Sequence, residues 1–439
     1  MTSPAAASVG KGRLALFAFG DFAFNLYWQS VMLFLLFYYT EALELPMAVA
    51  ATIYMAASVW DGAANFVAGV LTDRRKSVRG FGVVLGVGSI PLGLSFVLAY
   101  LPPPFAGTWG AATVFAGHLL FRTAYAAINV PYLAMSARVS SNPDDRAFVA
   151  GLRMLSGTAA AVLVALSTVP LGTWLSGSGN PAQTYLAAAM LFASVGTLVL
   201  MIVGATYRDA THDFRPYPAR LSAALLSLVR NRAFVALNLA MMAMIVAVTV
   251  LNKSVLYYFK YLVGNETAGQ LALASMGAVS AAAVPAWMIL GRWLGLRALW
   301  LVAAISAMVG LAAFSAVDIH GAGATQLFLI VMQAMFVGMF FAFWAMLPNT
   351  IEYGERATGL HVEGTVFGLS ALLQRVAIGA ATAILGWSFA DAGFVANVPQ
   401  SEATRAGMRA TIALVPLVFL ALSCAAMLWN PLGRPAVGR

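Results

Sequence analysis

The chain has 439 residues, of which 61% are hydrophobic and only 9% are charged. A soluble domain carries about a quarter of charged residues, so this composition excludes a soluble globular protein and predicts a surface that faces lipid. The net charge of +9 does not indicate a nucleic-acid partner, because the basic residues gather in short segments between apolar runs.

Twelve apolar runs are long enough to cross a bilayer, which takes about 20 residues in a helix. The first six lie near 13–40, 46–72, 80–100, 107–134, 149–172 and 183–206. The other six lie near 233–262, 268–291, 296–316, 322–348, 362–390 and 406–429. The first run is too long for a cleavable signal. We therefore predict an all-α membrane protein with twelve transmembrane helices.

The basic residues predict the orientation. Of the 25 Lys and Arg, 18 lie in the two termini and in the connections after even-numbered runs, whereas the opposite connections hold Lys260, Arg405 and Arg409. By the positive-inside rule, both termini face the cytoplasm of a multi-pass protein in a bacterial inner membrane.

A basic segment at 207–232 divides the chain into two halves, 1–206 and 233–439. The halves resemble each other: the aromatic end of the first run recurs in the seventh, and Pro131 of the fourth run corresponds to Pro348 of the tenth. This repeat predicts two pseudo-symmetric six-helix bundles joined by a cytoplasmic loop, as in the major facilitator fold.

Once the termini and connections are assigned, four basic residues are left within the apolar runs, and the clear acidic cases there are two. They are Asp21, Asp61, Arg122, Arg153, Lys253 and Arg375. A charge in lipid is costly unless it faces a cavity or a partner, so each is a functional candidate. An interhelical ion pair is an equal alternative for Asp21 and Arg153, near the ends of their runs.

Polar and aromatic side chains share helix faces with these charges, at spacings of three, four and seven residues. A lining of this kind is suited to a small polar solute. The substrate-binding candidates are Asp21, Asn25, Trp28, Arg122, Asn129, Arg153, Lys253, Trp344 and Gln374.

Several motifs occur in the order and on the runs expected of one family. They are Gly20-Asp21-Phe22, Tyr38-Tyr39-Thr40, Trp60-Asp61, Asn129-Val130-Pro131-Tyr132 and Glu352-Tyr353-Gly354-Glu355. In these motifs nearly the whole chain resembles the glycoside–pentoside–hexuronide:cation symporters. The resemblance implies a cation-site aspartate at Asp61 and a coupling residue at Arg375. It places sugar-binding positions at Asn25, Asn129, Arg153 and Trp344.

The chain departs from that family at the cation site. Where sodium-binding members have a second aspartate and a threonine, this chain has Asn65 and Ala126. Sodium prefers a cage of several oxygen ligands, whereas a lone carboxylate removed from water can carry a proton. We therefore expect proton rather than sodium coupling, with Asp61 as the carrier. In the rival interpretation, Arg375 keeps Asp61 charged and the protein is an uncoupled facilitator.

Two features favour an anionic substrate such as a uronide. Asparagines replace the two sugar-site aspartates, and the apolar runs hold four basic but only two acidic residues. A lysophospholipid or other amphiphile is the alternative.

We expect Asp73, Arg74, Glu352 and Glu355 to form cytoplasmic gating ion pairs.

The four histidines follow no metal-site spacing, and no nucleophile motif is present, so we expect no enzyme and no cofactor. The expected partners are the small-molecule substrate, the coupling cation and the lipid bilayer, with the protein as a monomer.

Overall fold

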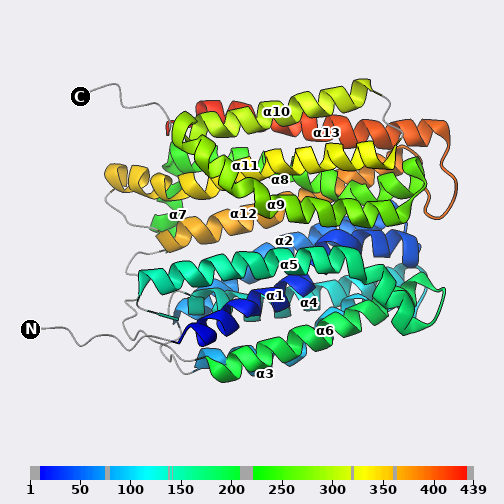
Figure 1. Cartoon of the computed structure of the whole chain (residues 1–439), viewed down its shortest axis with the longest axis horizontal. Helices are drawn as coiled ribbons and strands as arrows, with labels where there is room; N and C mark the ends of the chain where they lie inside the picture. Colours follow the sequence, from blue (N-terminus) through cyan, green and yellow to red (C-terminus); the bar gives the residue numbers. More distant parts are fainter. Residues whose placement is uncertain are drawn as a thin grey trace, which may run out of the picture. The chain divides into compact units, whose positions relative to one another are not determined.

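The computed structural model describes residues 10–74, 80–136, 139–140, 142–207, 221–317, 321–358 and 363–432. The helices of the first half are α1 (Lys11–Phe37), η1 (Tyr38–Ala42), α2 (Met47–Arg74), α3 (Gly80–Ala99), α4 (Gly107–Ser136), α5 (Pro143–Ser176) and α6 (Pro181–Thr206). Those of the second half are α7 (Leu221–Arg230), α8 (Arg232–Tyr258), η2 (Phe259–Val263), α9 (Glu266–Leu294), α10 (Leu296–Ala316), α11 (Ala322–Thr358), α12 (Glu363–Asp391) and α13 (Glu402–Trp429). Figure 1 shows them in chain order.

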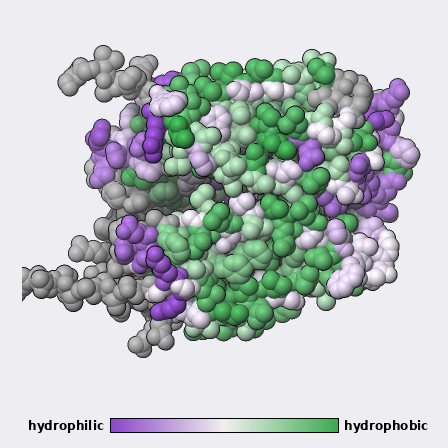
Figure 2. Space-filling view, in the orientation of Figure 1, coloured by the Kyte–Doolittle hydropathy of each residue, from purple (hydrophilic) through white to green (hydrophobic). Residues whose placement is uncertain are grey.

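Twelve of the described helices are long and apolar enough to cross a membrane, which confirms the predicted number of spans. Each predicted run lies within or close to one of these helices. Figure 2 shows hydrophobic residues over the middle of the helices and hydrophilic residues at their ends. This is the surface that a helical membrane protein presents to lipid, because hydrocarbon does not solvate polar groups.

The chain forms two compact units, and the division falls inside α2. Unit 1 comprises Met1–Tyr38 and Ala63–Tyr217, and unit 2 comprises Tyr39–Gly62 and Pro218–Arg439. The start of α2 therefore belongs with the helices of the second half of the chain. The division at 206 and 233 expected from the basic segment stays a prediction.

The internal repeat is visible in the helix pairing. In unit 1, α1 packs on α5 and α6, and α3 packs on α4 and α6. In unit 2, α8 packs on α12 and α13, and α10 packs on α11 and α13. The helices that open the two halves, α1 and α8, also each end in a π-helical turn, η1 and η2. These shared features support a duplicated six-helix plan.

Helix α7 was not predicted, because its ten residues are too few for a span and lie in the basic segment. Its Leu228 is buried against the rest of unit 2, and the helix contacts α8, α11 and α12. Asn231 begins the next helix: its Oδ1 accepts a hydrogen bond from the Phe234 amide at 3.0 Å, and its Nδ2 donates to the Thr350 carbonyl at 2.7 Å. The amide side chain thus caps α8 and ties it to α11.

Helices α3 and α6 approach each other through glycine. A Cβ atom added at Gly204 would lie 2.5 Å from the Gly82 carbonyl oxygen and 2.6 Å from the Gly86 nitrogen. At Gly151 on α5, by contrast, an added Cβ meets nothing within 4 Å. Small residues allow such backbone contacts in membrane bundles, where packing holds helices together.

We expect Gly204→Ala to destabilise unit 1 by about 1–3 kcal/mol, because the methyl group forces two helix backbones apart. Thermal unfolding in detergent measures this effect. The matched control Gly151→Ala should be neutral or slightly stabilising, since alanine favours a helix. Equal unfolding temperatures for the two variants would contradict the close α3–α6 contact.

Candidate functional site

An ion pair joins α1 to α5 in unit 1. The Nε of Arg153 donates to the Oδ2 of Asp21, and both side chains are largely buried. The Arg153 guanidinium also lies over the ring of Tyr132, 5.3 Å from its centroid, and the Tyr132 hydroxyl donates to the Phe17 carbonyl at 2.9 Å. The charge of Arg153 is therefore balanced within the protein. This ion pair between α1 and α5 is the arrangement given above as the alternative to substrate binding.

A ladder of amides continues from Asp21 along α1. The Nδ2 of Asn25 donates to the Asp21 carbonyl at 2.9 Å, and Gln29 donates to the Oδ1 of Asn25 at 3.3 Å. Helix α5 passes close to this ladder at Gly157, where an added Cβ would lie 3.0 Å from Asn25 Nδ2. On α4, the predicted Asn129 is 9% exposed. Of the two predicted sugar positions, Asn129 is thus buried in unit 1 and Asn25 is partly buried.

Arg122 is a buried cation set between an imidazole and an indole. Its Nε donates to the Nε2 of His118, one turn earlier on α4, at 3.1 Å, and its guanidinium lies 5.0 Å from the ring centroid of Trp28. Arg122 is 1% exposed and His118 is fully buried. Because Nε2 accepts this bond, His118 is neutral in this arrangement. Both contacts of Arg122 preserve its positive charge.

In unit 2 the candidate coupling residues Asp61 and Arg375 form an ion pair. The Nε of Arg375 lies 3.2 Å from Oδ2 of Asp61, whose side chain is 0% exposed. A Cβ added at Gly62 would lie 3.4 Å from Arg375 Cβ and from the Leu372 carbonyl oxygen, so α2 and α12 lie close together. The third candidate, Asn65, follows one turn later on α2, where the helix belongs to unit 1.

Three further predicted residues lie in unit 2. The ammonium of Lys253 is 3.7 Å from the ring centroid of Tyr54, and Lys253 is 5% exposed. Trp344 is half exposed and stacks with Phe367, with ring centroids 6.4 Å apart. Gln374 precedes Arg375 on α12, and no partner for its buried Nε2 is recorded within the described part of the chain. Trp344 can therefore offer an aromatic face to a ligand, and Gln374 can offer a hydrogen-bond donor.

The predicted gating residues Glu352 and Glu355 lie on the last turns of α11, which continues to Thr358. Both are exposed, and Glu352 lies 3.7 Å from Arg356 on its own helix. The side chains of Asp73 and Arg74 lie outside the described residues. Gating by this group stays a prediction.

The sequence did not single out Glu41. It lies on η1 at the end of the first span, and its side chain is 4% exposed. Its carboxylate accepts hydrogen bonds at 2.6 Å from Lys260 and from Tyr261. Glu41 falls at the end of an apolar run, and only its contacts with the lysine and tyrosine of η2 show that the carboxylate is part of the interior.

The sequence matches the family described as MFS/sugar transport protein over residues 16–434. This chain belongs to that family. The match confirms the resemblance to sugar:cation symporters and the absence of an enzyme activity, because its relatives are transporters.

This family member is 26% identical over 430 residues to a protein named putative 2,3-dihydroxypropane-1-sulfonate exporter of Salmonella typhimurium, with 95% of this chain and 91% of that protein covered. It is 23% identical to the putative sulfoquinovose importer of Escherichia coli, with 94% and 88% covered. It is 22% identical to the isoprimeverose transporter of Lactiplantibacillus pentosus, with 94% and 87% covered.

Solved structures share its fold. A bacterial homologue of the human lysosomal transporter Spinster aligns with a TM-score of 0.70 at 14% identity, covering 96% of each chain. A D-xylose-proton symporter aligns with a TM-score of 0.66 at 13% identity, covering 97% and 98%. The predicted major facilitator fold is confirmed, and the chain is a multi-pass membrane protein and a secondary transporter of the sugar type.

We expect Asp21→Asn and Arg153→Gln each to lower the unfolding temperature, because each leaves a largely buried charge without its partner. The double variant should be more stable than either single variant, since it removes both charges. Thermal unfolding in detergent gives the coupling between the two positions. Additive effects of the two substitutions would contradict a structural ion pair.

Proposed function

We propose that the protein is a proton-coupled symporter that moves a small, hydroxylated, anionic solute by alternating access. The carboxylate or sulfonate of the solute would be balanced by Arg122 and Lys253. The observation that carries this proposal is the setting of Arg122, which is 1% exposed and whose guanidinium contacts the imidazole of His118 and the indole of Trp28.

The charges within the spans support an anion. Of the four basic residues noted from the sequence, Arg153 pairs with Asp21 and Arg375 pairs with Asp61. The other two, Arg122 and Lys253, lie on the rings of Trp28 and Tyr54. Aromatic contacts stabilise a cation without neutralising it, so these two contacts leave the positive charge in place.

The relatives also support a hydroxylated anion. One carries 2,3-dihydroxypropane-1-sulfonate in its name, which combines a charged sulfonate with hydroxyl groups. Arginine is suited to such a group, because its planar guanidinium donates parallel hydrogen bonds to oxyanions. Trp28, Asn25 and Asn129 would supply the aromatic face and the amide partners for the hydroxyl groups.

Coupling is proposed to occur at Asp61. A proton and the Arg375 guanidinium compete for the same buried carboxylate, because the guanidinium stabilises the charged form and protonation removes that charge. Proton uptake would therefore release Arg375, and proton loss would restore the pair. The same pair is also compatible with an uncoupled facilitator, in which Asp61 stays charged throughout.

We expect uptake into proteoliposomes to prefer an acidic solute over its neutral counterpart, for example glucuronate over glucose, with 2,3-dihydroxypropane-1-sulfonate as a second anion. Arg122→Gln should reduce uptake of the anion at least tenfold, because one charge-assisted pair contributes about 1.5–3 kcal/mol. Arg122→Lys should retain part of the activity, since it keeps the charge but loses the planar fork.

Equal inhibition by neutral and acidic sugars would contradict the anionic substrate. A lysophospholipid in the same competition assay tests the amphiphile alternative, which predicts inhibition by the lipid and none by the sugars. Folding of each variant is checked by thermal unfolding in detergent.

We expect Asp61→Asn to abolish accumulation against a gradient while solute exchange between the two sides of the vesicle continues. The amide cannot carry the proton, but it leaves the substrate contacts in place. Proton flux and radiolabelled uptake in the same vesicles measure both properties. Accumulation by the variant would overturn the role of Asp61, and a wild-type protein that equilibrates solute without accumulating it would be the uncoupled facilitator.

A further inference from the structure

Glu41 joins three segments of unit 2 through its carboxylate and its backbone carbonyl. Its Oε2 accepts hydrogen bonds from Lys260 Nζ and from the Tyr261 hydroxyl, both on η2 and both at 2.6 Å. Asn397, in the connection between α12 and α13, donates from Nδ2 to the Glu41 carbonyl at 2.9 Å. Lys260 and the Asn397 amide close the network by donating to Asn397 Oδ1 and to the Tyr261 hydroxyl. The two bonds from η2 to the carboxylate are stronger while that group is charged.

The two carboxylates near Lys260 differ in their exposure to solvent. Lys260 is shared by two carboxylates, because its Nζ lies 2.6 Å from Glu41 and 3.5 Å from Glu266. Glu266 on α9 is half exposed, whereas the Glu41 side chain is 4% exposed. The Oε1 of Glu41 is buried, and no hydrogen-bond partner for it is recorded within the described residues. A desolvated carboxylate oxygen without a donor is costly, and a bound proton removes that charge.

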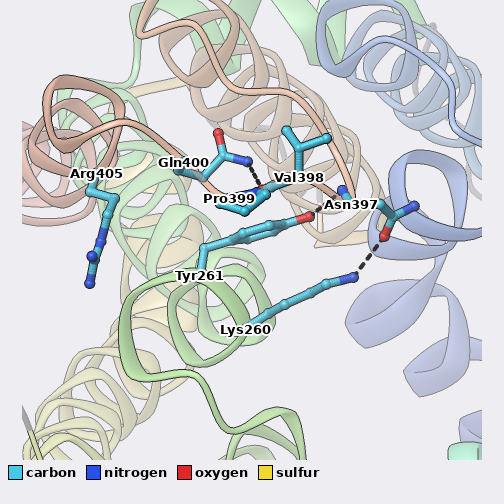
Figure 3. A pocket seen from close by; sticks show the side chains of 7 residues that line it. All are labelled: Lys260, Tyr261, Asn397, Val398, Pro399, Gln400 and Arg405. Carbon is cyan, nitrogen blue, oxygen red and sulfur yellow. Dashed lines mark hydrogen bonds between the residues drawn. The ribbon is translucent and has the colours of Figure 1, made fainter.

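Solvent reaches the partners of Glu41 through a pocket of about 380 Å³. Figure 3 shows Lys260 and Tyr261 in this pocket, with Arg405 at its other side. Arg405 on α13 donates to the Leu262 carbonyl at 3.3 Å, and Glu44, on the same segment as Glu41, is exposed. A proton from this face can therefore exchange with Glu41 through its hydrogen-bonded neighbours, while the carboxylate itself stays buried.

Residues 39–62 belong to unit 2, although the chain on both sides of them belongs to unit 1. Near one end of this segment, Glu41 binds η2, and Thr40 forms a 2.8 Å hydrogen bond with the hydroxyl of Tyr257 on α8. At the other end, Asp61 pairs with Arg375. Each end is thus held to unit 2 by an ion pair whose carboxylate a proton can neutralise.

We propose that Glu41 is a proton-sensing residue of the transport cycle, distinct from the coupling residue Asp61. A proton taken up from the pocket neutralises the carboxylate, Lys260 keeps its charge and remains with Glu266, and the start of segment 39–62 is released from η2. The inference rests on the proposed proton-coupled function and adds a second, separate site at which protons act. By the positive-inside count, the pocket faces outside the cell.

Hydrogen exchange of the intact protein in detergent tests the proposal. After correction for the intrinsic effect of pH, the amides of residues 38–46 should exchange about tenfold faster in acidic than in neutral buffer, because charge-assisted hydrogen bonds are lost. The buried α8 segment 240–250 serves as the internal reference and should not change. An unchanged rate for 38–46 in the wild-type protein would overturn the proposal without any substitution.

Glu41→Gln reproduces the neutral side chain. It should exchange rapidly in 38–46 at both pH values, whereas the matched control Glu266→Gln should keep the pH response because Glu41 and Lys260 remain paired. Tyr261→Phe removes a hydrogen bond but keeps the ion pair, so the pH response should also persist. If Tyr261→Phe abolished that response as fully as Glu41→Gln does, the network would be a structural brace and the proposal would be wrong.

The coupling role of Asp61 and the sensing role of Glu41 can be contradicted independently of each other. Glu41→Gln should still accumulate solute through Asp61, while uptake loses its dependence on the pH of the pocket side. Asp61→Asn should lose accumulation but keep the pH-dependent exchange of residues 38–46. Loss of accumulation in Glu41→Gln with normal folding would make Glu41 part of coupling and would contradict a purely sensing role.

Discussion

A charged side chain within a membrane span must be balanced, because hydrocarbon does not solvate it and the protein interior solvates it poorly. In this chain that requirement is met in two ways. Asp21 and Asp61 are paired with arginines of other helices, whereas Arg122 and Lys253 lie on aromatic rings. The ion pairs cancel charge, whereas the aromatic contacts stabilise a cation without cancelling it. The proposed role of Arg122 and Lys253 as substrate contacts is based on this difference.

The ion pairs also depend on how closely the helices approach. A Cβ added at Gly62 would contact Arg375 and Leu372 of α12 at 3.4 Å, and one added at Gly157 would lie 3.0 Å from the amide of Asn25. The helices therefore lie near enough for a short carboxylate such as Asp61 to reach its partner. Packing and electrostatics are therefore parts of the same arrangement, since a displaced helix would leave a charge without its counter-ion.

Segment 39–62 connects these local contacts to transport. It is held to unit 2 by polar groups along its length, from Glu41 through Lys253 on Tyr54 to Asp61. Ion pairs can break and reform without unfolding a helix, and protonation of a carboxylate is a direct way to break one. A chain segment with a carboxylate near each end is thus suited to a cycle that protons control.

Length, hydropathy and motif order were enough to predict the spans, the repeat and the family, because a bilayer imposes its demands on each apolar run separately. Asp61 and Arg375 were also found in this way, since charges stand out in an apolar run. Which charges meet could be seen only in the fold: the pairing of Asp21 with Arg153, and the burial of Glu41 against Lys260, depend on helix rotation and on contacts between residues far apart in the chain. For the same reason, α7 was missed, because its packing against α8 rather than its length makes it a helix.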